Sequence, residues 1–252
     1  MALALVTGAS SGVGRATVLA LRARGWEVLA VARRAAHLED LASDCAAAIH
    51  PLDAADPKAV DALLESLRGR TPDLIVNAAG AGRWHRLEDT SPAEARAMMD
   101  APFFAAFLIT RAFLPGMLKR GSGQIIHVNS PAAYQPWPHS ALYAASRGAL
   151  RSLHEALRQD LAGSGVMSSH ITFGKVSSDY FLSNPGTEER LPKIAKTFRT
   201  LSPEDCATLI LRLIDRPKAE AIHPPLMAFY LTVWRVWPGL VRWIIRITSP
   251  RP

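Results

Sequence analysis

Short runs of apolar residues alternate along the chain with stretches of helical length, in which apolar residues return every three or four positions. The runs ALALV, EVLAVA, DLIVNAAG, GQIIHVNS and SSHITFG predict buried strands. Helical segments at about 14–24 and 36–46, others up to about residue 120, and a long one at about 140–162 lie between them. Such alternation forms a parallel sheet, because each right-handed crossover places a helix on one face. The pattern therefore predicts an α/β fold with a doubly wound parallel sheet and helices on both faces.

A single domain over residues 1–252 accounts for this pattern. The 252 residues, of which 49% are hydrophobic and 20% charged, can bury a full core, which excludes disorder as the main state. No linker rich in Pro, Gly or Ser divides the chain. Two parts depart from the alternation. We expect residues 175–200 to form a flap over the binding site and residues 221–252 to form a hydrophobic, aromatic extension.

The charge and the cysteine content indicate which partners and which cellular compartment to expect. The formal net charge of +7 suits an anionic partner, but the 29 Lys and Arg residues are scattered and no basic run is interleaved with aromatic residues. We therefore expect no nucleic-acid partner. Cys45 and Cys206 are far apart and show no metal-ligand spacing, which is typical of reduced thiols. The first apolar run is too short for a signal peptide, so we expect a cytoplasmic protein.

A glycine-rich segment follows the first predicted strand. Gly8, Gly12 and Gly14 in ALALVTGASSGVGRA lie between this strand and the first predicted helix. Glycine allows a sharp turn and a close approach of phosphate oxygens to peptide N–H groups, and the helix N-terminus adds about half a positive charge. In this strand–turn–helix setting the glycines predict a dinucleotide site.

TGASSGVG (Thr7–Gly14) is followed by Asp53 in LDAAD, by NAAG (Asn77–Gly80), by Ser130, and by Tyr143 thirteen residues later. In order and spacing these five motifs resemble those of the short-chain dehydrogenase/reductase family, whose glycine fingerprint is T-G-x-x-x-G-x-G. The resemblance implies a Rossmann-type fold, a nicotinamide cofactor and an oxidoreductase that acts on a small molecule with an apolar body.

The end of the second predicted strand favours NADP(H) over NAD(H). An NAD enzyme of this fold uses a carboxylate there, whereas Ala32 stands at that position and Arg33 and Arg34 follow. A guanidinium pairs well with the 2′-phosphate of NADP, and Ser10 offers a hydroxyl. The alternative is that the two arginines only cap a solvated turn.

The resemblance also assigns roles to Asp53, Asn77 and Ala78. Asp53 is expected to accept a hydrogen bond from the adenine amino group, and Asn77 with Ala78 to line the adenosine ribose. The alternative for Asp53 is an ordinary turn or helix cap near Pro57. The complete predicted cofactor set is Thr7, Gly8, Ser10, Ser11, Gly12, Val13, Gly14, Arg33, Arg34, Asp53, Asn77, Ala78, Gly80, Tyr143, Arg147, Gly174, Val176 and Ser178.

The resemblance implies a catalytic group of Ser130, Tyr143 and Arg147. In the family a tyrosine exchanges a proton with the substrate oxygen, and a serine hydrogen-bonds that oxygen. A lysine four residues after the tyrosine lowers the pKa of the tyrosine and binds the nicotinamide ribose. Arg147 replaces this lysine. Its fixed charge still favours a phenolate, but a guanidinium is bulkier and cannot release a proton. We expect a slower reaction; an NADP(H)-binding protein with little turnover and a non-redox reaction on the same scaffold remain alternatives.

Two further departures from the family pattern follow. Pro102 stands where the family usually has an asparagine of its proton relay, and it removes the backbone bond to the carbonyl of Met98. We expect it to keep a helix distortion there; the alternative is that it starts a second helical segment. At the end of the run SSHITFG, Gly174 follows a phenylalanine rather than the family's proline, and Ser178 replaces a threonine, which is a mild change.

Two further residues lie between Ser130 and Tyr143, near the predicted substrate cleft. We interpret His139 as a solvated residue before a helix and Trp137 as part of an apolar pocket. The other histidines show no metal spacing, so we assign no metal. The resemblance also implies a homodimer or homotetramer formed through two long helices, and the apolar faces near 103–114 and 142–161 allow it.

The tail PPLMAFYLTVWRVWPGLVRWIIRIT contains three tryptophans and three arginines. It has no uncharged run of the ~18 residues that a spanning helix needs. Two interpretations stay open: helices that cover the substrate cleft or a neighbouring subunit, which we favour, and peripheral contact with a membrane, in which the arginines lie near lipid headgroups.

Overall fold

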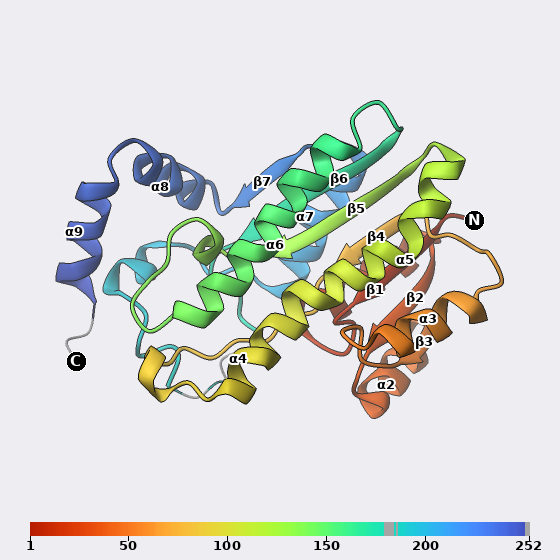
Figure 1. Ribbon diagram of the computed structural model, residues 1–252, viewed down its shortest axis with the longest axis horizontal. Helices are drawn as coiled ribbons and strands as arrows, with labels where there is room; N and C mark the ends of the chain where they lie inside the picture. The colour runs from red at the N-terminus through yellow and green to blue at the C-terminus, as the bar shows by residue number, and fades with distance from the viewer. Residues whose placement is uncertain (179–183, 185, 250–252) are drawn as a thin grey trace.

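The computed structural model describes residues 1–178, 184 and 186–249. Its centre is a seven-stranded parallel sheet in the order β3-β2-β1-β4-β5-β6-β7, with helices on both faces (Figure 1). The strand order reverses between β1 and β4, which is the switch point of a doubly wound sheet. This architecture confirms the predicted α/β fold.

The strands are short, and the helices between them are mostly longer. The strands are β1 (Leu3–Thr7), β2 (Glu27–Ala32), β3 (Ala48–Pro51), β4 (Leu74–Asn77), β5 (Gly123–Asn129), β6 (Val166–Phe173) and β7 (Glu220–His223). The longer helices are α1 (Gly12–Ala23), α2 (Ala35–Cys45), α3 (Pro57–Ser66), α4 (Pro92–Met99), α5 (Ala105–Arg120), α6 (Ala141–Asp160), α7 (Pro203–Asp215), α8 (Pro225–Val236) and α9 (Pro238–Thr248). Short 3-10 helices are η1 (Leu87–Asp89), η3 (Pro131–Ala133) and η4 (Lys193–Thr197), and η2 (Asp100–Phe104) is a π-helical turn.

Two hydrophobic layers hold the helices to the sheet. On one face, alternate strand residues such as Val6 and Val76 pack with Val18 of α1 and Ile210 of α7. The other layer, on the opposite face, joins strand residues that include Leu5, Leu29, Ile75 and Ile125 to α3, α5 and α6. Successive side chains of a strand point to opposite faces of the sheet. A strand that is buried on both faces therefore has a continuous run of apolar residues in its sequence.

The helical run that begins with α4 crosses this second layer. Residues Pro92–Arg120 form the one helix in the described part of the chain that is long and apolar enough, by composition, to cross a membrane. It packs against the sheet through Ile109, Phe113 and Met117, which are almost fully buried. This is the position of a core helix.

The tail forms a separate layer near the carboxyl ends of the strands. In Figure 1, the strands point toward α8 and α9, which lie beyond β7 at one end of the molecule. Met227, Tyr230 and Leu231 of α8 join Val241 and Ile245 of α9 in a third hydrophobic cluster. The tail therefore covers part of the sheet edge where a doubly wound fold places its ligand.

Candidate active site

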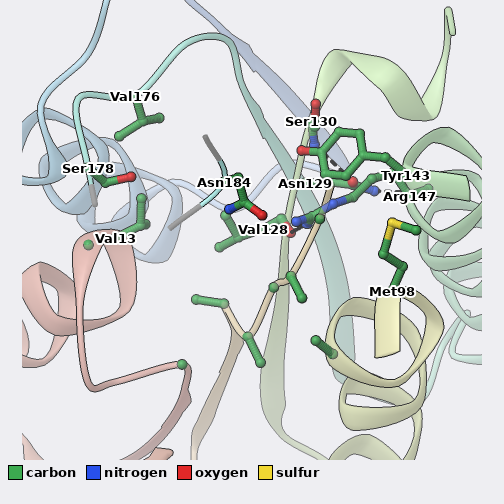
Figure 2. A pocket seen from close by; sticks show the side chains of 18 of the residues that line it. Val13, Met98, Val128, Asn129, Ser130, Tyr143, Arg147, Val176, Ser178 and Asn184 are labelled. Atoms are coloured by element: carbon green, nitrogen blue, oxygen red, sulfur yellow. Dashed lines mark hydrogen bonds between the residues drawn. The ribbon is translucent and has the colours of Figure 1, made fainter. Parts of the chain in front are cut away.

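A cavity of about 920 Å³ lies at the carboxyl edge of the sheet. The loops after β1, β2, β4, β5 and β6 and one face of α6 supply its walls. Figure 2 shows Val13 and Ser178 toward one side of this space and Ser130, Tyr143 and Arg147 toward the other. The cavity is large enough for a dinucleotide and lies at the switch point, where ligands of this fold bind.

The glycine loop is built by close backbone contacts. Gly8 has a φ of +69°, and a Cβ there would lie 2.7 Å from the carbonyl oxygen of Ala78. A Cβ on Gly14 would lie 2.3 Å from the carbonyl oxygen of Gly8. Thr7 does not line the cavity; its Oγ1 accepts hydrogen bonds from the N–H groups of Ala78 and Ala79, both at 3.1 Å. Glycine at position 8 therefore lets the loops after β1 and β4 touch, and glycine at position 14 lets the start of α1 pack against Gly8.

The N-terminus of α1 faces this loop without a side-chain cap. Ser11 is the N-cap residue, and its hydroxyl makes no cap hydrogen bond. Gly12 has a φ of +52°, and a Cβ there would lie 3.4 Å from the Cβ of Ser178, on the loop after β6. Uncapped N–H groups and the helix dipole suit an anionic group such as a diphosphate.

Arg34 crosses from the end of β2 to the glycine loop. Its Nη2 donates to Ser10 Oγ at 3.0 Å and to Ser11 Oγ at 2.6 Å, and its Nε donates to Ser10 Oγ at 3.2 Å. Arg33 and Ala32 also line the cavity, and both arginines are exposed. A guanidinium and two hydroxyls thus meet at one corner of the cavity.

Asp53 and Asn77 occupy different surroundings. Asp53 is exposed in the cavity wall, and its Oδ1 accepts from the N–H of Ala55 at 2.9 Å, whereas Asp56 supplies the cap of α3. Asn77 is buried behind the wall, where its Nδ2 donates to Thr110 Oγ1 at 3.2 Å. Asn77 therefore ties β4 to α5.

Tyr143 and Arg147 lie one turn apart on the same face of α6. They are 7% and 8% exposed, and both line the cavity. The guanidinium carbon of Arg147 lies 5.1 Å from the centre of the Tyr143 ring, which is within cation–π distance. A Cβ on Gly80 would lie 2.7 Å from Arg147 Nη2, so this glycine makes room for the guanidinium.

Ser130 completes this end of the cavity. It follows β5 and caps η3, and its Oγ accepts from the N–H of Ala132 at 3.3 Å. Because a hydroxyl has one proton and two lone pairs, this contact leaves its O–H available to donate. Ser130, Tyr143 and Arg147 thus line one region of the cavity, as Figure 2 shows.

Comparisons with known proteins agree with this geometry. The family described as short chain dehydrogenase matches residues 2–188. The chain belongs to the short-chain dehydrogenase/reductase family. It is 32% identical, over 85% of its length and 86% of the relative's, to an uncharacterized short-chain type dehydrogenase/reductase, y4eK, of Sinorhizobium fredii.

Solved structures of the family superimpose on most of the chain. A short-chain dehydrogenase from Streptomyces avermitilis has a TM-score of 0.81 at 28% identity, covering 96% of this chain and 97% of that one. A serine dehydrogenase in a closed form, complexed with NADP⁺, has a TM-score of 0.80 at 27% identity, with 87% and 93% covered. The structural neighbours of this short-chain dehydrogenase/reductase therefore include NADP complexes.

Asn129 is a site residue that the sequence analysis of this short-chain dehydrogenase/reductase missed. Its Oδ1 accepts from the N–H of Ser130 at 2.8 Å, and its Nδ2 donates to the carbonyl oxygen of Arg147 at 3.0 Å. The same Nδ2 lies 2.8 Å from Nε2 of the buried His170. Asn129 therefore holds Ser130 and α6 in a common position. The only sequence signal is a polar residue at the end of an apolar strand.

Trp84 is a second missed residue, on the loop after β4. It is buried, and its ring centre lies 5.8 Å from that of Tyr143 and 6.1 Å from that of Trp137. Trp84, Met98, Trp137, Leu191, Phe198 and Met227 give this end of the cavity of the short-chain dehydrogenase/reductase an apolar wall. His139 is not among the lining residues, whereas Trp137 is.

The helix that carries Pro102 contains a π-helical turn. In η2 the N–H of Ala105 donates to the carbonyl oxygen of Asp100, five residues earlier, and α5 begins at Ala105. Proline has no N–H to offer Met98, so a local widening of the helix is the expected result. A distortion at Pro102 is therefore present in this family member.

The loop after β6 closes the cavity. The N–H of Gly174 donates to the carbonyl oxygen of His223 at 2.9 Å, Val176 forms a bridge with Leu201, and Ser178 reaches the glycine loop. The predicted flap includes residues 179–183 and 185, which lie outside the described residues. Of the predicted cofactor set, Gly174, Val176 and Ser178 all line the cavity.

Proposed function

We propose that this protein is an NADP(H)-dependent oxidoreductase that interconverts a carbonyl group and a secondary alcohol on a hydrophobic small molecule. One observation carries the proposal. Tyr143, Arg147 and Ser130 line the same cavity as the glycine loop and Arg34. A proton donor and an apolar wall thus share one cavity with a cluster suited to phosphates.

The cavity residues fit NADP(H). The uncapped start of α1 would hold the diphosphate, and Arg34 with Ser10 and Ser11 would hold the 2′-phosphate, because a planar guanidinium binds phosphate oxygens in pairs. The missing carboxylate at Ala32 supports this choice. Asp53 would accept from the adenine amino group. When bound, the cofactor gives or takes a hydride.

The side chains at the other end would handle the proton. The Tyr143 hydroxyl would give a proton to the substrate oxygen in reduction and take it back in oxidation. Ser130 would donate its O–H to the same oxygen while its lone pair accepts from Ala132. Arg147 would stabilise the phenolate by its fixed charge, 5.1 Å from the ring centre. Arg147 Nε, buried and without a hydrogen-bond partner in the described chain, would serve a ribose hydroxyl.

The same geometry supports a slow enzyme. Arg147 keeps the charge of the family's lysine but cannot release a proton, and Pro102 has no amide side chain for a relay. Arg147 lies over the ring face of Tyr143. This position favours, as the second candidate function, an NADP(H)-binding protein with little turnover.

The apolar wall and an exposed aromatic group support two further parts of the proposal. Trp84, Trp137 and Met227 would contact the apolar body of the substrate, because large rings bury much area at little entropic cost. Phe104 and Phe107 are exposed on η2 and α5, and the Phe103 ring stacks with that of Phe107. We propose this surface as the contact of a cytoplasmic homodimer or homotetramer.

A paired assay tests the function. NADPH binding is measured by fluorescence, and NADPH oxidation by absorbance with a panel of hydrophobic ketones, for wild type, Tyr143→Phe and Arg147→Lys. The proposal expects turnover in wild type, its loss in Tyr143→Phe with NADPH binding retained, and no loss in Arg147→Lys. Binding without turnover on any ketone would support the second candidate function, and a protein that does not bind NADPH would contradict both.

A further inference from the structure

The outer faces of α8 and α9 carry exposed apolar side chains. Of the thirteen exposed large hydrophobic residues in the described chain, six belong to these two helices and a seventh, Trp237, lies between them; each of the seven is between 46% and 66% exposed. On α9 they recur at intervals of three and four positions, which places them on one face. We call these residues the tail surface: Leu226, Phe229, Val236, Trp237, Leu240, Trp243 and Ile247.

The tail surface is distinct from the face that holds the tail to the protein. Met227 and Leu231 of α8 and Val241 and Ile245 of α9 point inward and are buried. These two helices therefore have an apolar side toward the protein and another toward solvent. Packing within the described chain accounts only for the apolar side toward the protein.

Two segments beside the tail surface contain cations and no acidic residue. Residues 190–200 and 225–248 contain seven Lys and Arg and no Asp or Glu. The rest of the chain has the other 22 of the 29 Lys and Arg and all 22 Asp and Glu, so these two segments account for the whole formal charge of +7. They are neighbours, because η4 packs against α9. Along the sequence these cations look scattered, and the fold gathers them.

Several of these cations are open to solvent. Lys193, Lys196, Arg242 and Arg246 are exposed, and the guanidinium carbon of Arg242 lies 5.2 Å from the centre of the Trp234 ring. Arg199 and Arg235, by contrast, pair with the carboxylates of Asp205 and Glu220. Exposed cations thus border exposed aromatic and aliphatic side chains.

We propose that the tail surface binds an anionic lipid bilayer. Tryptophan rings favour the headgroup level, aliphatic side chains enter the acyl boundary, and arginine pairs with lipid phosphates. A second copy of the chain is a poorer occupant, because a two-fold contact would set this excess of positive charge against itself. Helices of twelve and eleven residues, divided at Pro238, are too short to span a bilayer of about 30 Å, so the contact is peripheral.

This contact would bring lipid close to the candidate active site. Met227 lies on the inner face of α8 and lines the cavity, so a bilayer on the outer face would be about one helix diameter, ~10 Å, away. Binding to lipid does not depend on the proposed reaction. The test below is therefore made without substrate.

Vesicle co-sedimentation of the full chain tests the proposal. Vesicles of phosphatidylcholine mixed with phosphatidylglycerol should sediment the protein, phosphatidylcholine alone should sediment less, and added salt should weaken binding. Arg242→Gln and Arg246→Gln should each lower the partition coefficient about fivefold, because one cation near an anionic surface is worth about that factor. Arg216→Gln and Lys218→Gln, equal charge changes on the exposed turn before β7, are the matched controls.

A second pair of variants tests the apolar contribution. Trp237→Ala with Trp243→Ala should lower the partition coefficient more than about tenfold, because the two rings bury a large area. The control is Met167→Ala, which truncates a 42% exposed side chain at the start of β6. Circular dichroism and NADPH binding of each variant show that the fold is retained.

Three results would overturn the proposal. The first is equal sedimentation with and without anionic vesicles, and the second is equal binding of wild type and the tail variants. The third is a sedimentation-velocity shift from dimer to monomer caused by the tail variants without lipid, which would make the tail surface a subunit contact. NADPH oxidation in lipid-free buffer is read separately, so a failure of the proposed reaction is not mistaken for a failure of lipid binding.

Discussion

Replacing Arg147 with methionine removes the fixed charge beside Tyr143 and keeps most of the side-chain volume. The guanidinium carbon lies 5.1 Å from the ring centre, and Arg147 is only 8% exposed, so added salt screens the pair weakly. With the ring centre taken as the position of the phenolate charge and an effective dielectric constant of about 20, a cation at this separation stabilises the phenolate by about 3 kcal/mol. That energy corresponds to a factor of roughly 200 in the rate of a step that forms the phenolate.

The assay compares kcat and the Kd for NADPH on a ketone that wild type reduces. Arg147→Met should lower kcat by roughly 200-fold, and its Kd for NADPH should rise much less, because the phosphate contacts at the glycine loop remain. Arg147→Lys should keep most of the activity, since it restores a cation. If Arg147→Met lowers kcat and Arg147→Lys does not, the loss is due to the missing charge and not to altered packing.

Arg151→Met is the matched control on the same helix. The guanidinium carbon of Arg151 lies 4.4 Å from the centre of the Tyr134 ring, and Arg151 is not among the residues that line the cavity. The substitution removes the same contact one turn further along α6 and should leave kcat unchanged. Equal kcat values for wild type and Arg147→Met, or equal losses in the two methionine variants, would refute the electrostatic role of Arg147.

Three further predictions address the cofactor, the packing and the response to acid. Arg34→Ala should raise the Kd for NADPH about tenfold and leave NADH binding unchanged in a fluorescence titration, because it removes a charge-assisted hydrogen-bond donor; equal effects on both cofactors would contradict this. Gly80→Ala should lower kcat, since the new Cβ meets Arg147 Nη2 at 2.7 Å and the guanidinium must shift from its place over the Tyr143 ring; an unchanged kcat would count against that close approach. Burial lowers the pKa of His127 to about 3 and that of His170 to about 2, from 6.5. Only the unfolded chain therefore gains these two protons as the pH falls below 6.5, and the free energy of unfolding should drop by up to about 2.7 kcal/mol per pH unit; equal free energies at pH about 7 and about 5.5 would contradict this.

The strands show what can be predicted from a linear pattern. EVLAVA coincides with β2 (Glu27–Ala32), because a strand buried on both faces needs a continuous apolar run. The apolar pattern did not predict β7 (Glu220–His223), an edge strand whose residues are all half-buried, and therefore less apolar. The helices α3 and α7 were not predicted either, although both bury apolar residues.

The chain topology alone brings part of the predicted site together. Parallel strands end at the same edge, so residues just after β1, β2, β4 and β5 must come together, and Ser10, Arg34, Gly80 and Ser130 do line one cavity. Which side of a strand end faces the cavity is not determined in this way. Thr7 and Asn77 were expected beside the cofactor, and they lie behind the wall.

Periodicity and local backbone chemistry determined the sheet, the glycine turn and the shared helix face of Tyr143 and Arg147, because each depends on residues only a few positions apart. The tertiary structure decided the contacts between distant segments: Trp84 beside Tyr143, Gly80 beneath Arg147, and the cations of η4 next to the tail. Such contacts depend on how loops and layers pack across tens of residues, and no local pattern in the chain encodes that packing.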